Sequence, residues 1–264
     1  MKNQWLFVLL LFVCFGMSCS HPKVDEQSAG IENHNPQKLK ENHSKEVSQV
    51  FKPFKAHNGV ELPYTVELPT NYDRTQAYPT LFVFTSLEYD MKRAHFLKDE
   101  FFTGFSNEDW IIVMAVAPKG GHHGWINHPA HHALNDLMDH VQKDHTIQNN
   151  QFHFLGFHDG GIPAATFAGM SKKYVQSLTW IESEDWSDFD EKGYDRLSDL
   201  DIPLILIVGE NDKKYLSLAQ QAVVAFEKRK ADITLLTQAQ DDEQVASLKQ
   251  GVLLEKLSPY LLKK

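Results

Sequence analysis

The sequence predicts an α/β fold, in which a mostly parallel, twisted sheet carries helices on both faces without a large cap domain. The first observation is that short apolar runs of strand type alternate with longer segments of helical periodicity. The second is that these runs do not alternate strictly between polar and apolar residues, which is typical of strands buried on both faces. With 264 residues, of which 42% are hydrophobic, the chain is long enough to bury a large core.

The elements follow one another in a regular order after residue 50. Asn58 and Gly59 stand between the segments 51–57 and 60–68, and this pair is typical of a tight hairpin turn. Buried strands are then expected at 80–85, 111–116, 152–156, 175–181, 204–208 and 233–236. Helices are expected between and after them at 91–105, 129–145, 161–173, 215–230 and 243–262. The helical period is clearest in the expected helix at 129–145, where one apolar stripe contains Ala130, Ala133, Leu134, Leu137, Met138 and Val141.

The first 18 residues have the three sections of a bacterial export signal. Lys2 precedes an apolar run at 5–15, and small residues follow that run. Cys19 comes next, which resembles the arrangement of a lipoprotein signal, in which this cysteine is acylated and becomes the mature N-terminus. We therefore expect a membrane-anchored lipoprotein of the cell envelope. Gly16 and Ser18 also suit ordinary signal cleavage, so a secreted or periplasmic protein is the alternative.

Residues 19–50 predict a flexible polar linker between this signal and the folded domain. The segment is poor in aromatic residues and mixes Lys, Glu, Asn, Gln and Ser with two prolines. Such a composition cannot bury enough apolar surface to offset the entropy lost on ordering. A single domain at 51–264 accounts for the rest of the chain.

Charge and cysteine content exclude several classes of function. The formal net charge is −9 and no basic block occurs in the C-terminal two thirds, so nucleic acid is not an expected partner. Both cysteines, Cys14 and Cys19, lie in the first twenty residues, and the body of the protein therefore has no disulfide or thiolate metal site. No cofactor is expected. The expected partners are a small molecule, a peptide or a glycan, and the membrane through the lipid anchor.

The segment 152–161 carries the motif that decides the fold. It runs from a strand through a glycine-flanked turn into a helix, which is the G-x-X-x-G pattern of a nucleophile elbow, with His158 at its centre. Two further phrases accompany it, 64–73 (Tyr-Thr-Val-Glu-Leu-Pro-Thr-Asn-Tyr-Asp) with Tyr-Pro at 78–79, and 202–212 (Ile-Pro-Leu-Ile-Leu-Ile-Val-Gly-Glu-Asn-Asp). Over 51–264 the chain resembles the α/β-hydrolases, in particular the esterase-like and prolyl-oligopeptidase-like branch.

The resemblance implies a catalytic serine, an acid and a histidine in that chain order, and this sequence matches only the acid, Asp212. His158 stands in the place of the serine, and it is the last of the 14 histidines, so none follows the final strand. The backbone N–H of Asp159 is the expected oxyanion donor. The other oxyanion loop departs from the family as well, since Thr85-Ser86 stands where His-Gly is usual. His is tolerated at the elbow because the turn requires a positive φ.

Two functions of different class follow from this pattern. The first is a non-catalytic binding protein, a pseudo-esterase whose cleft recognises a ligand without turning it over. The alternative is an active ester or peptide hydrolase that uses His158 or a metal-assisted site. Recruitment of Ser86 or Ser183 as a nucleophile is disfavoured, because neither stands on a sharp turn.

Acidic residues follow several strands, at the end of the sheet where ligands bind in such folds. They are Glu182, Glu184, Asp185, Glu210, Asp212, Asp241 and Asp242. Either a cation binds between His158 and Asp212, or these are solvated loop carboxylates with a hydrogen bond from His158 to Asp212. Glu182 and Asp185 are candidate ligand-binding residues on this ground.

Other residues are candidates by position or spacing. Trp125 lies where related esterases often have a tryptophan at the substrate cleft, although a lone tryptophan is more often a packing residue. His132, Asp136 and His140 recur every four residues, a spacing that suits a metal site or an exposed polar helix face.

Overall fold

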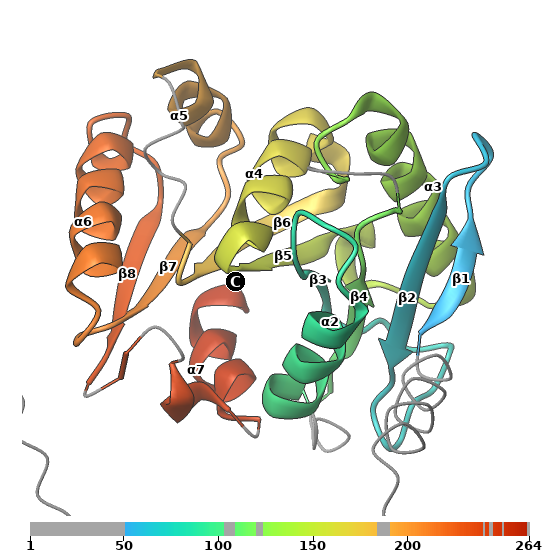
Figure 1. Cartoon of the computed structure of the whole chain (residues 1–264). Coiled ribbons are helices and arrows are strands. Elements are labelled where there is room, and N and C mark those ends of the chain that lie inside the picture. The colour runs from blue at the N-terminus through green and yellow to red at the C-terminus, as the bar shows by residue number, and fades with distance from the viewer. Residues whose placement is uncertain are drawn as a thin grey trace, which may run out of the picture.

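The computed structural model describes residues 51–102, 109–119, 124–183, 191–239, 241–242, 245–249 and 251–262. These residues form an eight-stranded sheet with the strand order β1-β2-β4-β3-β5-β6-β7-β8 (Figure 1). The predicted signal peptide, Cys19 and the whole of the predicted linker therefore lie outside the described residues.

The sheet is mixed only at one edge. β1 pairs antiparallel with β2 and β2 with β4, whereas every other neighbouring pair is parallel. The strands are β1 (Lys52–Lys55), β2 (Glu61–Glu67), β3 (Thr80–Phe84), β4 (Ile111–Ala115), β5 (Phe152–Phe157), β6 (Val175–Ile181), β7 (Leu204–Gly209) and β8 (Ile233–Gln238). In the β1–β2 hairpin, Gly59 has a φ of +84°, and the Asn58 Oδ1 atom accepts the N–H of Val60 at 3.1 Å. The predicted hairpin and the mostly parallel sheet are confirmed.

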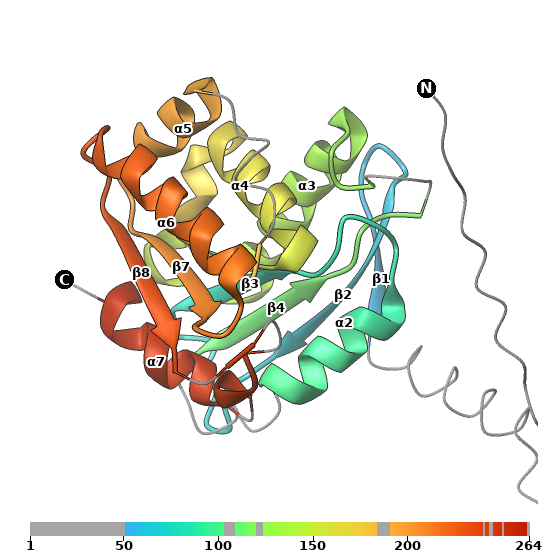
Figure 2. The same ribbon diagram turned by 60° about the vertical axis from the view of Figure 1, so that its left-hand side comes forward.

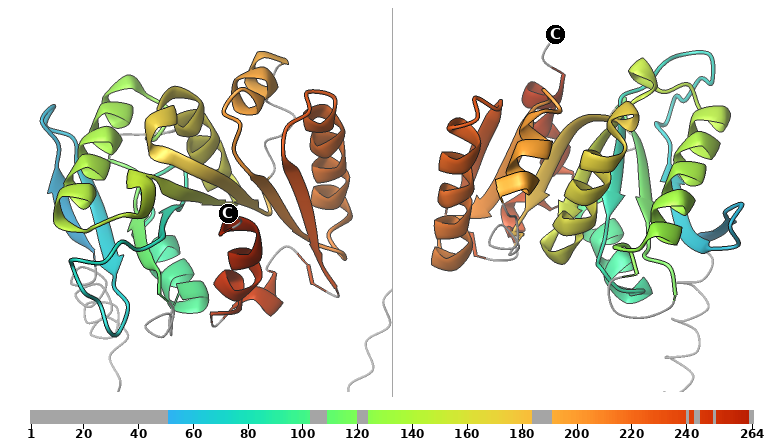
Figure 3. Two further views of the ribbon diagram at one scale, coloured as in Figure 1. Left: turned by 180° about the vertical axis from the view of Figure 1, so that it is seen from behind. Right: turned by 90° about the horizontal axis from the view of Figure 1, so that it is seen from above.

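Helices cover both faces of the sheet, as predicted (Figures 1 and 2). They are α2 (Met91–Leu97), α3 (His128–Asp144), α4 (Gly161–Met170), α5 (Glu191–Ser198), α6 (Lys213–Glu227) and α7 (Val252–Leu261). α2 and α7 lie on one face, and the other four lie in a row along the opposite face, which is clear from above (Figure 3).

Each face has its own apolar core, because successive strand residues point to opposite sides. On β3, Leu81 and Val83 belong to the cluster that includes the buried side chains of α2 and α7. Phe82 and Phe84 belong to the cluster that includes those of α3 to α6. Most residues of the central strands are therefore apolar, which explains the lack of strict alternation in the sequence.

Two helical predictions need correction. The sequence predicts one helix at 243–262, but the structure has a 3-10 turn at Ala246–Leu248 and then α7, which begins after Gly251 at a φ of +91°. α5 was not predicted, and it is a short helix in which only Gly193, Tyr194 and Leu197 are buried. No described helix is long and apolar enough to cross a membrane.

The topology places the carboxyl ends of β3 and β5 side by side at a switch point. β3 lies between β4 and β5 in the sheet. The connection from β3 to β4 carries α2 on one face, whereas the connection from β5 to β6 carries α4 on the other (Figure 1). Open α/β sheets bind ligands in the crevice that forms where the connections diverge in this way.

Candidate functional site

The candidate site is built around the turn that joins β5 to α4. His158 follows β5 with a φ of +48°, and a 3-10 turn, His158–Gly160, leads into the helix. A Cβ atom on Gly160 would lie 2.1 Å from the carbonyl oxygen of Thr85, and one on Gly156 would lie 2.5 Å from that of Gly160. Strand, turn and helix therefore approach so closely that only glycine fits at these two positions. This is the elbow geometry that the sequence pattern predicts.

A cleft of about 550 Å³ opens beside His158, a volume in the range of small-molecule sites. Its described lining combines α2 and the π-helical turn Lys98–Phe102 with the end of β5 and the chain after β8. The apolar lining residues are Phe96, Leu97, Phe101, Phe157 and Val245. The rings of Phe101 and Phe157 pack with their centroids 4.7 Å apart, while Phe96 is half exposed. One side of the cleft is therefore an aromatic wall.

The polar side chains among the described lining residues are Arg93, His158 and Lys249. A guanidinium nitrogen of Arg93 lies 3.7 Å from the Asp159 carboxylate, and both side chains are about one-third exposed. The Lys249 ammonium lies 3.0 Å from the Glu100 carboxylate and 5.4 Å from the centroid of the Phe96 ring. These groups form a basic rim beside the aromatic wall.

Asp212, at the predicted acid position, begins α6. One oxygen of its carboxylate accepts the backbone N–H groups of Lys214 at 3.1 Å and of Tyr215 at 3.0 Å. It is therefore the N-cap residue of this helix, which gives the carboxylate a structural role independent of catalysis. The Tyr215 ring, on the first turn, lies 6.5 Å from the imidazole of His158, centroid to centroid.

The chain after β8 is held by its own polar contacts. Residues 239–245 contain no histidine. The Asp241 carboxylate accepts the hydroxyl of Ser247 at 2.6 Å and its backbone N–H at 3.0 Å. The buried Gln238 side chain accepts from the ammonium of Lys256 at 3.1 Å. Val245 then adopts a φ of +38°, and its buried side chain lines the cleft.

The other acidic residues at the strand ends that the structure describes are largely engaged with the backbone or with neighbouring side chains. Glu182 is fully buried with a φ of +49°, and its carboxylate accepts the N–H of Gly209 at 2.5 Å, which joins the ends of β6 and β7. Glu210 accepts from the Thr237 hydroxyl at 3.1 Å. Asp185 and Glu184 lie outside the described residues. Glu182 was predicted to bind a ligand, but in the structure its carboxylate joins the ends of two strands.

Trp125 and the two candidate serines are in buried positions. Trp125 is fully buried, with its ring 5.9 Å from that of Phe84, which is the packing role that the sequence analysis considered. Ser86 and Ser183 are 3% and 5% exposed. The Ser86 hydroxyl donates to the carbonyl of Glu88 at 2.6 Å, and a Cβ on Gly161 would lie 2.4 Å from the hydroxyl of Ser183.

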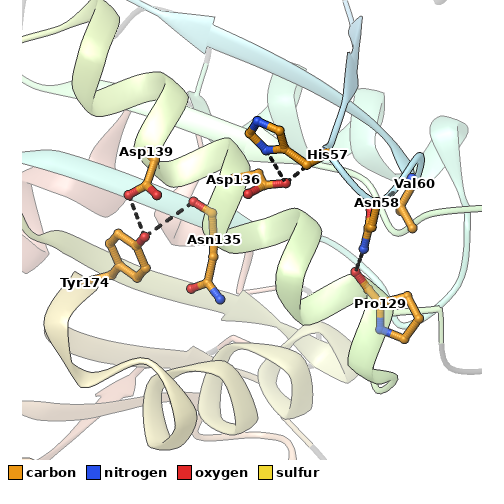
Figure 4. Close-up of polar contacts among 8 residues, drawn as sticks. All are labelled: His57, Asn58, Val60, Pro129, Asn135, Asp136, Asp139 and Tyr174. Carbon is orange, nitrogen blue, oxygen red and sulfur yellow. Dashed lines mark hydrogen bonds and ion pairs between the residues drawn. The ribbon is translucent and has the colours of Figure 1, made fainter.

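The outer face of α3 carries the residues considered for a metal. The Asp136 carboxylate bonds to the imidazole of His57 at 3.1 Å and to its backbone N–H at 2.9 Å (Figure 4). His140 lies 3.1 Å from the Tyr64 hydroxyl, and His132 packs against His128. Within the described ranges, no group of three histidine, cysteine or acidic side chains is placed to hold a metal ion. Asp136 and His140 instead fasten the β1–β2 hairpin to α3.

Sequence reasoning missed Arg93, Phe96 and Lys249 as cleft residues. Nothing marks them in the sequence, because they belong to no motif and lie far apart in the chain. They meet because α2 and the chain that leads into α7 pack on the same face of the sheet (Figure 2).

Comparison with known proteins rests on structure alone. No family model matches the sequence, and no curated protein matches it. A thermostable esterase superposes with a TM-score of 0.62 at 12% identity, covering 82% of this chain and 63% of the esterase. Est1E from Butyrivibrio proteoclasticus superposes with a TM-score of 0.59 at 13% identity, covering 80% of this chain and 97% of Est1E. The chain has the α/β-hydrolase fold.

This α/β-hydrolase fold also occurs within longer proteins. Dipeptidyl peptidase 4 from Porphyromonas gingivalis superposes with a TM-score of 0.59 at 13% identity, covering 80% of this chain and 35% of the peptidase. The chain thus spans less than two thirds of the thermostable esterase and about a third of the peptidase. At these identities the likeness establishes the fold and its order of elements.

Proposed function

We propose that the protein is a non-catalytic binding protein, a pseudo-esterase that holds a small ligand in the cleft beside His158. In this proposal it is exported and anchored to a membrane of the cell envelope through lipid on Cys19. The fold positions the cleft at the switch point of the sheet, and the conventional serine chemistry is absent from it.

The observation that carries this proposal is the identity of two positions. At the elbow, where the fold forces a positive φ, the side chain is the imidazole of His158. After β8, where the resemblance expects the histidine that activates a serine, the chain has none. Loss of one member of a catalytic triad typically costs about four orders of magnitude or more in rate, and two members are replaced here.

The cleft supports a binding function independently of chemistry. Its volume of about 550 Å³ and its aromatic wall suit a small molecule with an apolar part. Est1E, which has the same fold, has also been solved with ferulic acid bound.

Hydrolysis of an activated ester tests the proposal against an active hydrolase. The full-length protein, purified in detergent, and the His158→Ala variant would be compared on 4-nitrophenyl butyrate, with and without a chelator. We expect equal and near-background rates in all four samples. A wild-type rate that falls in His158→Ala would support a histidine-dependent hydrolase, and a rate that falls with chelator would support a metal-assisted one.

The lipid anchor is tested separately. Cells that express the protein would be grown with an alkyne-labelled palmitate, and the protein would be recovered for detection of the label. We expect label on the wild type and none on the Cys19→Ser variant. Label-free wild-type protein in the culture medium would support plain secretion instead.

A further inference from the structure

The charge of the cleft is opposite to that of the whole molecule. The chain has a formal net charge of −9. Yet the described cleft-lining residues that carry a charged or titratable side chain, Arg93, His158 and Lys249, are all basic. A site of this sign in an acidic protein favours an anion over a cation.

The nearby carboxylates do not cancel this preference. Asp159 and Glu100 pair with Arg93 and Lys249, but neither is among the described residues that line the cleft. The Arg93–Asp159 separation of 3.7 Å is long for a hydrogen bond, and the Glu100 side chain is 41% exposed. Such exposed pairs hold their partners weakly, so a ligand carboxylate can compete for the two cations.

The strand-end acids that suggested a cation site are used elsewhere. Asp212 caps α6, Glu182 accepts the N–H of Gly209, and Asp241 binds Ser247. α4, in contrast, begins at the elbow. The partial positive charge of this helix N-terminus adds to the basic rim.

The opposite part of the cleft is apolar. The Phe101 and Phe157 rings pack together in its wall, and Phe96 extends this surface to the rim, where the Lys249 ammonium lies 5.4 Å from its centroid. A ligand that satisfies both parts has an apolar body and one anionic end.

We propose that the cleft binds amphipathic monocarboxylates, with the carboxylate held by Lys249 and Arg93 and the apolar body packed against the phenylalanine wall. This inference rests on the proposed binding function and names its ligand class. It favours an anion over the cation that the sequence left as one of two alternatives.

Three probes that share a ten-carbon tail and differ in head group test the proposed ligand class. Decanoate, decanol and decyltrimethylammonium would be titrated, below their micellar or solubility limits, into the full-length protein in detergent-free nanodiscs, by calorimetry against empty nanodiscs that correct for partitioning into lipid. Decanoate is expected to bind about tenfold tighter than decanol, the effect of one charge-assisted contact, and the ammonium weakest. Added salt is expected to weaken decanoate binding and to leave decanol binding unchanged.

Three variants assign the effect to the rim. Lys249→Gln is expected to weaken decanoate binding about tenfold and to leave decanol binding unchanged. Glu100→Gln removes the competing carboxylate and is expected to tighten decanoate binding by about twofold to threefold. Lys228→Gln removes one positive charge from an exposed position outside the cleft and is expected to change neither affinity.

The outcomes separate this inference from the proposed function. Equal affinities for decanoate and decanol, or a Lys249→Gln variant that binds decanoate as well as the wild type, would overturn the anion assignment while leaving a binding cleft. Tightest binding of the ammonium would restore the cation hypothesis. Absence of binding by all three probes would overturn the inference, and the ester assay would still decide whether the protein is a hydrolase.

Discussion

The elbow after β5 and the chain after β8 are held in place in different ways. At the elbow the backbone is constrained by the fold, since Gly156 and Gly160 are in contact with neighbouring main chain whatever side chain stands at 158. After β8, contacts of Asp241, Gln238 and Ser247 hold the chain. Close packing of the main chain therefore fixes the elbow, whereas side-chain hydrogen bonds hold the chain after β8.

The largest effect on stability is expected from a substitution that fills the space at the elbow. Gly160→Ala would place a methyl group 2.1 Å from the Thr85 carbonyl oxygen and 2.4 Å from that of Phe84. We expect a loss of about 3 kcal/mol in the free energy of unfolding, measured by urea titration. Gly169→Ala in α4 is the matched control.

At Gly169 the closest atom to a new Cβ would be 3.9 Å away. Because alanine favours helix more than glycine does, this control is expected to gain up to about 1 kcal/mol. Equal effects of the two substitutions would show that the elbow is not packed as described.

His153, a histidine within β5, gives a test of strand stability that does not involve the cleft. His153 is fully buried beside Trp110 and bonds to the Ser177 hydroxyl at 2.8 Å, and burial lowers its pKa to about 4. The unfolded chain binds a proton near the ordinary value of 6.5, whereas the folded protein binds it only near 4. Stability is therefore complete above pH 6.5 and falls as the pH drops toward about 4.

The expected loss across this range is about 3 kcal/mol for one histidine, added to the effects of other groups. Urea titrations at several pH values would measure it. His153→Gln is expected to fold less stably at neutral pH but with a shallower pH dependence. An unchanged pH dependence in this variant would show that His153 is not the group responsible.

The chain after β8 is expected to give a smaller effect. Asp241→Asn weakens the two bonds from Ser247, and we expect a loss of about 1 kcal/mol in the free energy of unfolding. Asp199→Asn is the control, because the hydrogen bond that Asp199 accepts from Lys172 goes to its backbone carbonyl, which the substitution leaves in place. A neutral Asp241→Asn would mean that these contacts do not hold the segment.

The smallest effect is expected from the substitution that looks most drastic chemically. His158→Ser restores a hydroxyl at the elbow, and the free energy of unfolding is expected to change by less than about 1 kcal/mol because the flanking glycines are kept. No esterase activity is expected to appear, since the chain after β8 supplies no base. Hydrolysis of 4-nitrophenyl butyrate by this variant above the His158→Ala rate would mean that another base is within reach.

The fold was predictable because most residues of its central strands are apolar and its elbow glycines have a fixed spacing. The helices were less predictable from the sequence. The segment 243–262 has an apolar pattern throughout, but Val245 and Gly251 adopt positive φ values and divide it. α5 was missed because a short polar helix with few buried residues has little periodicity to detect.

The candidate site was predictable only in part. His158 and Asp212 follow from motifs, whereas Arg93 and Lys249 come from elements that meet through tertiary packing. The acidic residues suggested a cation site because sequence shows which residues end a strand, but not which backbone N–H groups they accept. Glu182 illustrates this, since its bond to Gly209 depends on the neighbouring strand.

The central claim is that no side chain in this cleft forms a covalent bond with an ester substrate. The most direct measurement is the intact mass of the full-length protein after incubation with excess 4-nitrophenyl butyrate and rapid acid quenching. We predict an unchanged mass for the wild type and for His158→Ala. A wild-type mass increased by one butyryl group, located on His158 or on a serine and absent from His158→Ala, would contradict the account.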